Sequence, residues 1–423
     1  MRSVRQRNVF LISIGSELLK GETINSNLAF LGRVLFEYGY KLAGERSVPD
    51  NPEEIGAALD EALSAADYVI TCGGLGPTFD DITRKVIAAY FNRPLKFSAS
   101  HYKNLIMRIS KKRKLSRQSR NGFRLQCYFP EKSSVISNAI GSAWGFSLNS
   151  GNKKVISLPG VPQEFEGMLL NEVVPKHLQR DKQKSNPACL IAKTIGLSEV
   201  DFMKYLGALP PEEEMLCGIY PDVGEVRFSA VAAENGKKSA GLISKLKSRI
   251  EKKLKKHLYS MNSRISFEEA VANLLSKKRL TVSCAESCTG GYASKLLTNV
   301  PGSSKYFVGG VIAYSNRAKQ DAAGIDGGLI KKYGAVSEQI AGKLAENIRK
   351  IMNTSYGIGI TGIAGPGGGS RQKPVGLVYI GLADSKYVNV QEYIFRGNRE
   401  RIRLLAAKQA LYLLWRKIKF GSF

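Results

Sequence analysis

The chain has 423 residues, of which 43% are hydrophobic and 23% are charged, and its formal net charge is +27. This length predicts two or three domains, and the composition is that of a globular protein rather than a disordered or fibrous one. Six scattered cysteines without a Cys-x-x-Cys pair indicate free thiols in a reducing compartment. The same cysteine pattern argues against a structural zinc site.

The amino terminus resembles a signal peptide only superficially, because its apolar run at residues 9–14 is short and is followed by glycine and glutamate. No uninterrupted apolar stretch is long enough to span a bilayer, so we expect no membrane partner and a cytoplasmic location. The densest positive runs lie at residues 108–120, 245–256 and 396–403. They contain few aromatic residues that could stack bases, and we interpret them as solvated helix faces rather than a nucleic-acid surface.

Strand-like and helix-like patterns alternate along the first part of the chain, with short loops between them. The predicted strands are residues 9–15, 40–48, 68–72 and 155–158, and the predicted helices are residues 25–38, residues 52–63, a segment ending at Tyr90 and a segment beginning at Pro162. Such alternation predicts a mostly parallel sheet covered by helices on both faces.

The pattern changes after Pro175. A polar linker is predicted at residues 179–187, and a small αβ unit follows, with a strand at 225–234 and a basic helix at 242–258. A second linker at residues 261–264 precedes a second α/β domain. Its predicted helices are residues 267–277, 337–351 and 399–415, and its predicted strands are residues 280–284, 306–313, 356–361, 375–383 and 388–395. The predicted domains are therefore residues 1–178, 179–262 and 263–423.

Three segments of the last domain each end an apolar strand with glycine and polar residues. They are SCAESCTGG (residues 283–291), VIAYSNRAKQ (311–320) and GITGIAGPGGGS (359–370). Ligands on α/β sheets gather at the carboxyl ends of strands, so these segments are predicted to converge. Backbone amides where a helix begins can bind a phosphate or stabilise an oxyanion, which makes the first segment a candidate for either role.

The three histidines of the chain lie outside these segments, which argues against a Ser–His–Asp triad. A nucleophilic Ser287 would need another base, and Lys319 can serve if burial lowers its pKa. Cys288 is a competing nucleophile, although no histidine stands nearby to activate its thiol. Each residue also fits an ordinary structural position, Ser287 as a helix cap and Lys319 on a helix surface. The residues alone leave the choice open.

AESCTGG, followed by PGSSKYFVGGVIAYSNRAK, YGAVSE and TGIAGPGGGS…KPVG, resembles the CinA C-terminal domain, the family of nicotinamide mononucleotide deamidases. The resemblance implies hydrolysis of the nicotinamide carboxamide to a carboxylate, releasing ammonia and nicotinic acid mononucleotide, without a cofactor. It implies Ser287 as nucleophile, Lys319 as general base and Tyr314 as a supporting hydroxyl. The expected substrate and oxyanion contacts are Thr289, Gly290, Gly291, Asn316, Thr361, Gly362, Ala364, Gly365 and Arg399.

YVITCGGLGPTFDD is the strongest motif of the first domain. Its glycines Gly73, Gly74 and Gly76 would let the backbone wrap a phosphate. Thr78, Asp80 and Asp81 are predicted to open the next helix, and the two aspartates to bind a divalent metal that bridges a pyrophosphate. Helix capping is the alternative interpretation of these residues.

Together with IGSELLKGETINSN and LPGVPQEFEGM, this motif resembles the CinA N-terminal domain, which shares its fold with molybdopterin-binding proteins. The resemblance implies metal-dependent ADP-ribose pyrophosphatase activity, with Glu17 and Asn25 also matching the family pattern. Two segments depart from that pattern: NGFRLQCYFP, with Arg124 and Gln126 only roughly in register, and SAWGF, where Trp144 replaces a proline of the expected substrate loop.

The predicted fold class is α/β, with a molybdopterin-binding-like three-layer domain, a small αβ middle domain and an α/β CinA-type C-terminal domain. The predicted function is nicotinamide mononucleotide deamidation, with ADP-ribose as the ligand of the first domain and a homodimer implied by the resemblance. Two alternatives are a competence-related DNA-associated protein, supported by the basic runs, and a molybdopterin-biosynthesis protein, which leaves the C-terminal half unexplained.

Overall fold

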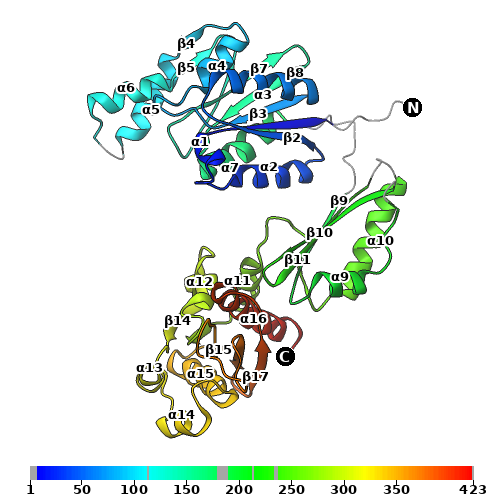
Figure 1. Cartoon of the computed structure of the whole chain (residues 1–423), viewed down its shortest axis with the longest axis vertical. Coiled ribbons are helices and arrows are strands. Elements are labelled where there is room, and N and C mark those ends of the chain that lie inside the picture. Colours follow the sequence, from blue (N-terminus) through cyan, green and yellow to red (C-terminus); the bar gives the residue numbers. More distant parts are fainter. Residues whose placement is uncertain (1–6, 112–113, 179–188, 212–213, 233–236, 422–423) are drawn as a thin grey trace. The chain divides into compact units, whose positions relative to one another are not determined.

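The computed structural model describes residues 7–111, 114–178, 189–211, 214–232 and 237–421 (Figure 1). The chain divides into two compact units, Met1–Pro187 and Ala188–Phe423. The linker predicted at residues 179–187 lies outside the described residues. Within the described ranges, no helix is both long and apolar enough to cross a membrane.

The first unit is built on a six-stranded sheet of order β2-β1-β3-β8-β7-β6. The pairs β1–β2, β1–β3 and β3–β8 are parallel, whereas β7 pairs antiparallel with β8 and with β6. The strands are β1 (Asn8–Ile14), β2 (Lys41–Val48), β3 (Tyr68–Cys72), β6 (Ser134–Ile136), β7 (Gly145–Ser150) and β8 (Lys153–Leu158). The mostly parallel sheet predicted from the alternating pattern is confirmed.

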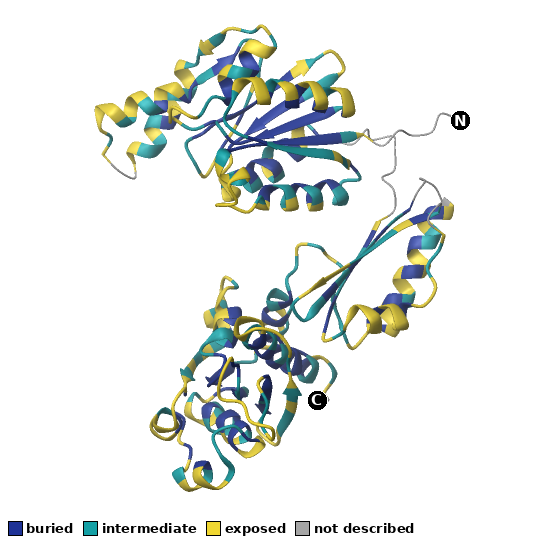
Figure 2. Ribbon diagram, in the orientation of Figure 1, coloured by how far each residue is buried: buried dark blue, intermediate teal, exposed yellow. Residues whose placement is uncertain are grey.

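Helices cover both faces of this sheet, and its strands are largely buried between them (Figure 2). One core layer joins the sheet to α3 (Pro52–Ala65), α4 (Thr83–Tyr90) and α5 (Ala99–Ser110), and the other joins it to α2 (Ser26–Glu37) and α7 (Pro162–Met168). The remaining elements are α1 (Ser16–Leu19), α6 (Arg117–Leu125), a π-helical turn (Leu169–Val173), α8 (Val174–Lys176), and the paired strands β4 (Leu95–Phe97) and β5 (Tyr128–Pro130).

The second unit begins with a four-stranded antiparallel sheet of order β10-β11-β9-β12, a split βαβ topology. Its core joins the sheet to two helices. The elements are β9 (Cys189–Ile195), α9 (Glu199–Leu206), β10 (Met215–Asp222), β11 (Glu225–Ala232), α10 (Lys237–Lys253) and β12 (Leu258–Ser260). The helix predicted at residues 242–258 is wrong at its end. Its four-residue apolar spacing continues to Leu258, but that residue pairs with Thr194 on β9 instead.

The C-terminal part of the second unit holds a five-stranded sheet of order β14-β13-β15-β16-β17. β13 lies parallel to both β14 and β15, and the remaining pairs are antiparallel. The strands are β13 (Val282–Glu286), β14 (Phe307–Ile312), β15 (Tyr356–Gly362), β16 (Leu377–Ala383) and β17 (Val388–Ile394). The α/β fold class is therefore confirmed in both units.

Helices also flank this second sheet. α11 (Phe267–Lys278), α12 (Tyr292–Thr298) and α16 (Arg399–Phe420) pack on one face, and α15 (Glu338–Ile351) packs on the other. α15 approaches β15 closely because the strand carries glycines: a Cβ at Gly359 would lie 2.3 Å from the Ala341 carbonyl oxygen. Two further helices, α13 (Asn316–Asp321) and α14 (Gly327–Tyr333), follow β14.

Candidate active site

The three glycine-rich and polar segments converge at one edge of the C-terminal sheet. Each follows one of the three neighbouring parallel strands: residues 287–291 follow β13, residues 313–316 follow β14 and residues 363–368 follow β15. Parallel strands end at the same edge, so these loops share one end of the sheet. The convergence predicted from the sequence is confirmed.

Ser287 is held by the strand next to its own. Its backbone N–H donates to the Ile360 carbonyl at 2.9 Å, and only 7% of the residue is exposed. The chain then turns through Gly290 and Gly291, whose φ angles of 58° and 92° favour glycine. A Cβ at Gly291 would lie 3.3 Å from the Ile312 side chain. The turn therefore fixes Ser287 at the sheet edge.

Lys319 lies on α13 and points its amine at Ser287. Its Nζ donates to Ser287 Oγ at 3.0 Å and to the Ala313 carbonyl at 2.9 Å, and the residue is 2% exposed. Within the described residues no carboxylate forms an ion pair with it. Burial lowers the pKa of Lys319 from its ordinary value, opposed only by the charge of Cys288 when that thiol ionises. Such an amine can accept the Ser287 proton.

Cys288 is adjacent to Ser287 but has the wrong protonation state for a nucleophile. Burial raises the pKa of its thiol to about 12, although hydrogen bonds from its own amide and the Thr289 amide favour the thiolate. At neutral pH the thiol is protonated, and the thiolate is the reactive form. Ser287, with a base at hydrogen-bonding distance, is the better candidate.

A cavity of about 280 Å³ opens beside the Ser287–Lys319 pair. Nine of the predicted site residues line it: Ser287, Tyr314, Asn316, Lys319, Thr361, Gly362, Ala364, Gly365 and Arg399. Three others, Thr289, Gly290 and Gly291, do not, because the turn carries them behind Ser287.

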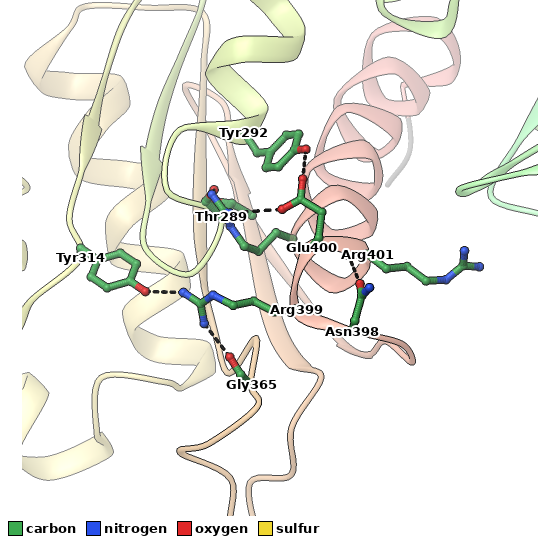
Figure 3. Close-up of polar contacts among 9 residues, drawn as sticks. Thr289, Tyr292, Tyr314, Gly365, Asn398, Arg399, Glu400 and Arg401 are labelled. Carbon is green, nitrogen blue, oxygen red and sulfur yellow. Dashed lines mark hydrogen bonds and ion pairs between the residues drawn. The ribbon is translucent and has the colours of Figure 1, made fainter. Parts of the chain in front are cut away.

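Arg399 and Tyr314 meet at the cavity (Figure 3). The guanidinium of Arg399 donates to Tyr314 Oη at 2.6 Å and to the Gly365 carbonyl at 2.7 Å. Arg399 is exposed and Tyr314 is 57% exposed, so this end of the cavity is open to solvent. An accessible guanidinium beside a neutral hydroxyl suits a phosphate or another anion.

In the first unit, the glycine-rich loop is held by its own residues. Gly73, with φ of 111°, lies so close to the neighbouring strand β1 that a Cβ would come within 2.1 Å of the Ile14 carbonyl oxygen. The Asp81 carboxylate accepts the amides of Gly76 at 2.6 Å and Thr78 at 2.8 Å. α4 begins only at Thr83, so the prediction that Thr78, Asp80 and Asp81 open the helix is wrong. Asp81 braces the loop instead.

The predicted metal site of this loop has an incomplete ligand set. Asp81 already uses both carboxylate oxygens, and Asp80 is exposed. Across the described ranges, no three His, Cys, Asp or Glu side chains group to hold an ion. In this arrangement Asp80 and Asp81 do not form a ligand set that fits a divalent metal.

The other predicted residues of the first unit are mostly structural. Asn25 caps α2 by accepting the Leu28 amide, and it donates to Ser13 Oγ at 2.9 Å, whereas Glu17 is exposed. Gly74 and Thr83 are in such close contact that a Cβ on the glycine would meet the threonine hydroxyl.

Of the residues that depart from the family pattern, Gln126 and Trp144 are buried and Arg124 is exposed. Gln126 is 1% exposed, and Arg124 lies 4.5 Å from the centre of the Phe97 ring. Trp144 belongs to a buried cluster and packs edge-on against His101, with ring centres 5.0 Å apart. The indole of Trp144 is thus used for packing, and the role of residues 142–146 as a substrate loop stays a prediction.

Two family matches cover most of the chain. The CinA C-terminal domain matches residues 264–418, and a probable molybdopterin binding domain matches residues 10–179. A CinA-like protein of Dictyoglomus thermophilum is 40% identical, covering 96% of this chain and 98% of its own. The chain belongs to the CinA family. A putative competence-damage inducible protein of Clostridium beijerinckii is 38% identical over the same shares of both chains.

A solved structure is similar to part of this chain. The CinA protein of Thermoplasma acidophilum is 34% identical, with a TM-score of 0.37, and the match covers 41% of this chain and 99% of that one.

The sequence reasoning missed several residues of the CinA site. Cavity-lining residues that it did not assign are Ala335, Val336, Ile363, Gly367 and Gly368. The wall at Ala335 and Val336 is held by side chains from two other segments. Lys373 Nζ donates to the Val336 carbonyl at 2.6 Å, and Thr361 Oγ1 donates to the Ala335 carbonyl at 2.7 Å. The YGAVSE and KPVG motifs could have indicated this wall, since both belong to the resemblance but had no assigned role.

Proposed function

We propose that the C-terminal domain hydrolyses the carboxamide of nicotinamide mononucleotide, giving nicotinic acid mononucleotide and ammonia. The observation that carries the proposal is the buried Lys319 amine, which has no carboxylate partner in the described chain and lies 3.0 Å from Ser287 Oγ. The family membership and the anion-suited Arg399 at the cavity support a phosphorylated substrate.

In the proposed first step, Ser287 Oγ attacks the amide carbon while Lys319 accepts the hydroxyl proton. The carbonyl electron pair moves onto oxygen, and the amide of Cys288, which directly follows the nucleophile and belongs to a residue that lines the cavity, is the proposed donor to it. The C–N bond then breaks, and the proton held by Lys319 leaves with the nitrogen as ammonia.

In the second step, water attacks the Ser287 ester and Lys319 accepts a proton from it. The C–O bond to Ser287 breaks, the proton returns to Oγ, and the product acid leaves as its carboxylate after giving its remaining proton to solvent. No cofactor takes part in either step. The phosphate is expected at Arg399 and the ribose at the glycine-rich loop of residues 362–368.

Ammonia release from nicotinamide mononucleotide tests the proposal in the full-length protein. We expect Ser287→Ala and Lys319→Ala each to lower kcat/KM by at least about a hundredfold. Cys288→Ala, which removes the thiol that is protonated at neutral pH, is expected to stay within a few-fold of wild type. The matched control is Lys331→Ala, because Lys331 is an exposed lysine of α14.

Two outcomes contradict the assignment. Normal activity in Ser287→Ala with loss in Cys288→Ala would make the thiol the nucleophile. An inactive wild type would exclude this substrate, and other amides and salt-dependent DNA binding would then be the alternatives to measure.

ADP-ribose pyrophosphatase activity of the first unit stays a prediction from the resemblance. Asp81 braces the glycine-rich loop, and no observation in the described residues favours this second activity.

A further inference from the structure

Arg403 lies behind the nucleophile loop rather than in the cavity. It stands one helical turn after Arg399 on α16, and its Nη2 donates to the Thr289 carbonyl at 2.9 Å. The guanidinium also lies over the Tyr292 ring, 5.2 Å from the ring centre, and 3.4 Å from the Glu400 carboxylate. Figure 3 shows Tyr292 and Glu400 joined beside Thr289 at the start of the helix.

The contact reaches the backbone that sets the position of Ser287. Thr289 is fully buried, and the Gly290 amide donates to the Ser287 carbonyl at 3.0 Å. A Cβ at Gly290 would lie 3.2 Å from Arg403 Nη2, so the guanidinium rests directly against this turn. The turn thus receives a charged hydrogen bond from an element 114 residues away in the sequence.

We propose that Arg403 is a positioning residue, which holds the 287–291 turn so that Ser287 Oγ stays at the Lys319 amine. The inference rests on the proposed function, since it takes Ser287 as the nucleophile. Arg403 does not line the cavity, so it is not expected to touch the substrate. Residues four apart lie on the same face of a helix. The start of α16 therefore presents two arginines on one face: Arg399, which lines the cavity, and Arg403, which contacts the 287–291 turn.

Steady-state deamidation by Arg403→Met and Arg403→Lys separates positioning from binding. A small misplacement of a reacting group costs about a hundredfold, so kcat of Arg403→Met is expected to fall by about that factor. KM is expected to stay within about twofold, because the cavity is intact. Arg403→Lys keeps the positive charge and a donor for the Thr289 carbonyl. Its kcat is expected to be about tenfold higher than that of Arg403→Met. The matched control is Arg401→Met, an exposed arginine of the same helix that points away from the cluster (Figure 3).

Amide hydrogen exchange of residues 287–292 gives a readout that needs no substrate. We expect these amides to exchange faster in Arg403→Met than in Arg401→Met, while amides of β15 and α15 are unchanged. Equal exchange in the two variants, or kcat of Arg403→Met within about twofold of Arg401→Met, would overturn the inference. If wild type does not deamidate nicotinamide mononucleotide, the proposed function fails and the exchange comparison alone decides whether Arg403 holds the turn.

Discussion

Lys319 combines two properties that oppose each other, burial and charge. In the described chain it has hydrogen-bond partners but no counter-ion, and burial lowers its pKa. Between that lowered pKa and the ordinary lysine value, the unfolded chain binds more protons than the folded one. The stability of the second unit therefore increases as the pH rises through this window, and it is lowest where Lys319 is protonated in both states.

Lys319→Met is accordingly expected to abolish deamidation and to raise thermal stability at neutral pH. Methionine keeps most of the side-chain length and needs no solvation, so the midpoint should rise by ~2–4 °C, which is about 1 kcal/mol for a unit of this size. Calorimetric melts at increasing pH measure the thermal midpoint of each protein. The difference in midpoint between Lys319→Met and wild type should shrink as the pH approaches the ordinary pKa of lysine. Ser287→Ala keeps the amine and is the control. A variant that melts below wild type at every pH would contradict this account.

Some residues of the candidate site could be predicted from the sequence, and others could not. Ser287, Lys319 and Tyr314 were predicted from ordered motifs, and the structure brings all three to one cavity. Only the resemblance favoured Ser287 over Cys288, since the chemical reason for the choice depends on how strongly the fold buries the thiol. Arg403 looked like part of a solvated basic run, since a contact with a carbonyl 114 residues away leaves no local pattern.

At the scale of elements, Glu286 joins β13 to α12. This last residue of the strand is 1% exposed, and its carboxylate accepts the Ala293 and Ser294 amides at 3.0 and 2.8 Å and the Ser294 hydroxyl at 2.7 Å. The amides belong to the first turn of the helix, where no intrahelical acceptor is available. Glu286 therefore fixes the helix that follows the nucleophile turn.

Glu286→Gln is expected to destabilise the second unit by about 1–3 kcal/mol, because the new amide group would face donors that need an acceptor. Urea unfolding measures the change, with Glu338→Gln, an exposed first-turn glutamate of α15, expected to stay within about 0.5 kcal/mol. Equal midpoints for the two variants would show that solvent satisfies the α12 amides as well as the carboxylate does.

The bounds of helices and strands were predicted well where the apolar pattern of the sequence matches the way the element packs in the fold. β3, α15 and β17 lie within a residue or two of their predicted bounds, since each combines a clear apolar pattern with turn residues at its ends. The end of α10 was missed because Leu258 continues the helical spacing while its backbone pairs with β9. α4 begins later than predicted because Asp81 bonds backward to the loop instead of capping the helix.

At the scale of the molecule, the second unit couples its two sheets through α16. Lys408 on this helix forms an ion pair with Glu225 on β11, and the two side chains are 11% and 15% exposed. The Tyr259 hydroxyl donates to the same carboxylate, and Tyr412 Oη lies 2.8 Å from His257 Nδ1. The helix that begins with Arg399 at the cavity thus contacts the other sheet of this unit through Lys408 and Tyr412 in its middle turns. This coupling explains why residues 189–260 and the C-terminal sheet form one compact unit.

Glu225→Gln tests this coupling. It would leave the buried Lys408 amine without its counter-charge, and we expect a loss of about 3 kcal/mol in the unfolding of the second unit. The double variant Glu225→Met, Lys408→Met removes both charges and is expected to recover most of that loss, since apolar side chains can replace a buried pair. Calorimetry of the full-length protein would measure this loss, and the transition of the first unit should stay as in wild type. A double variant no more stable than Glu225→Gln would mean that the contact depends on the specific hydrogen bonds of Glu225, Tyr259 included, rather than on the balance of charge.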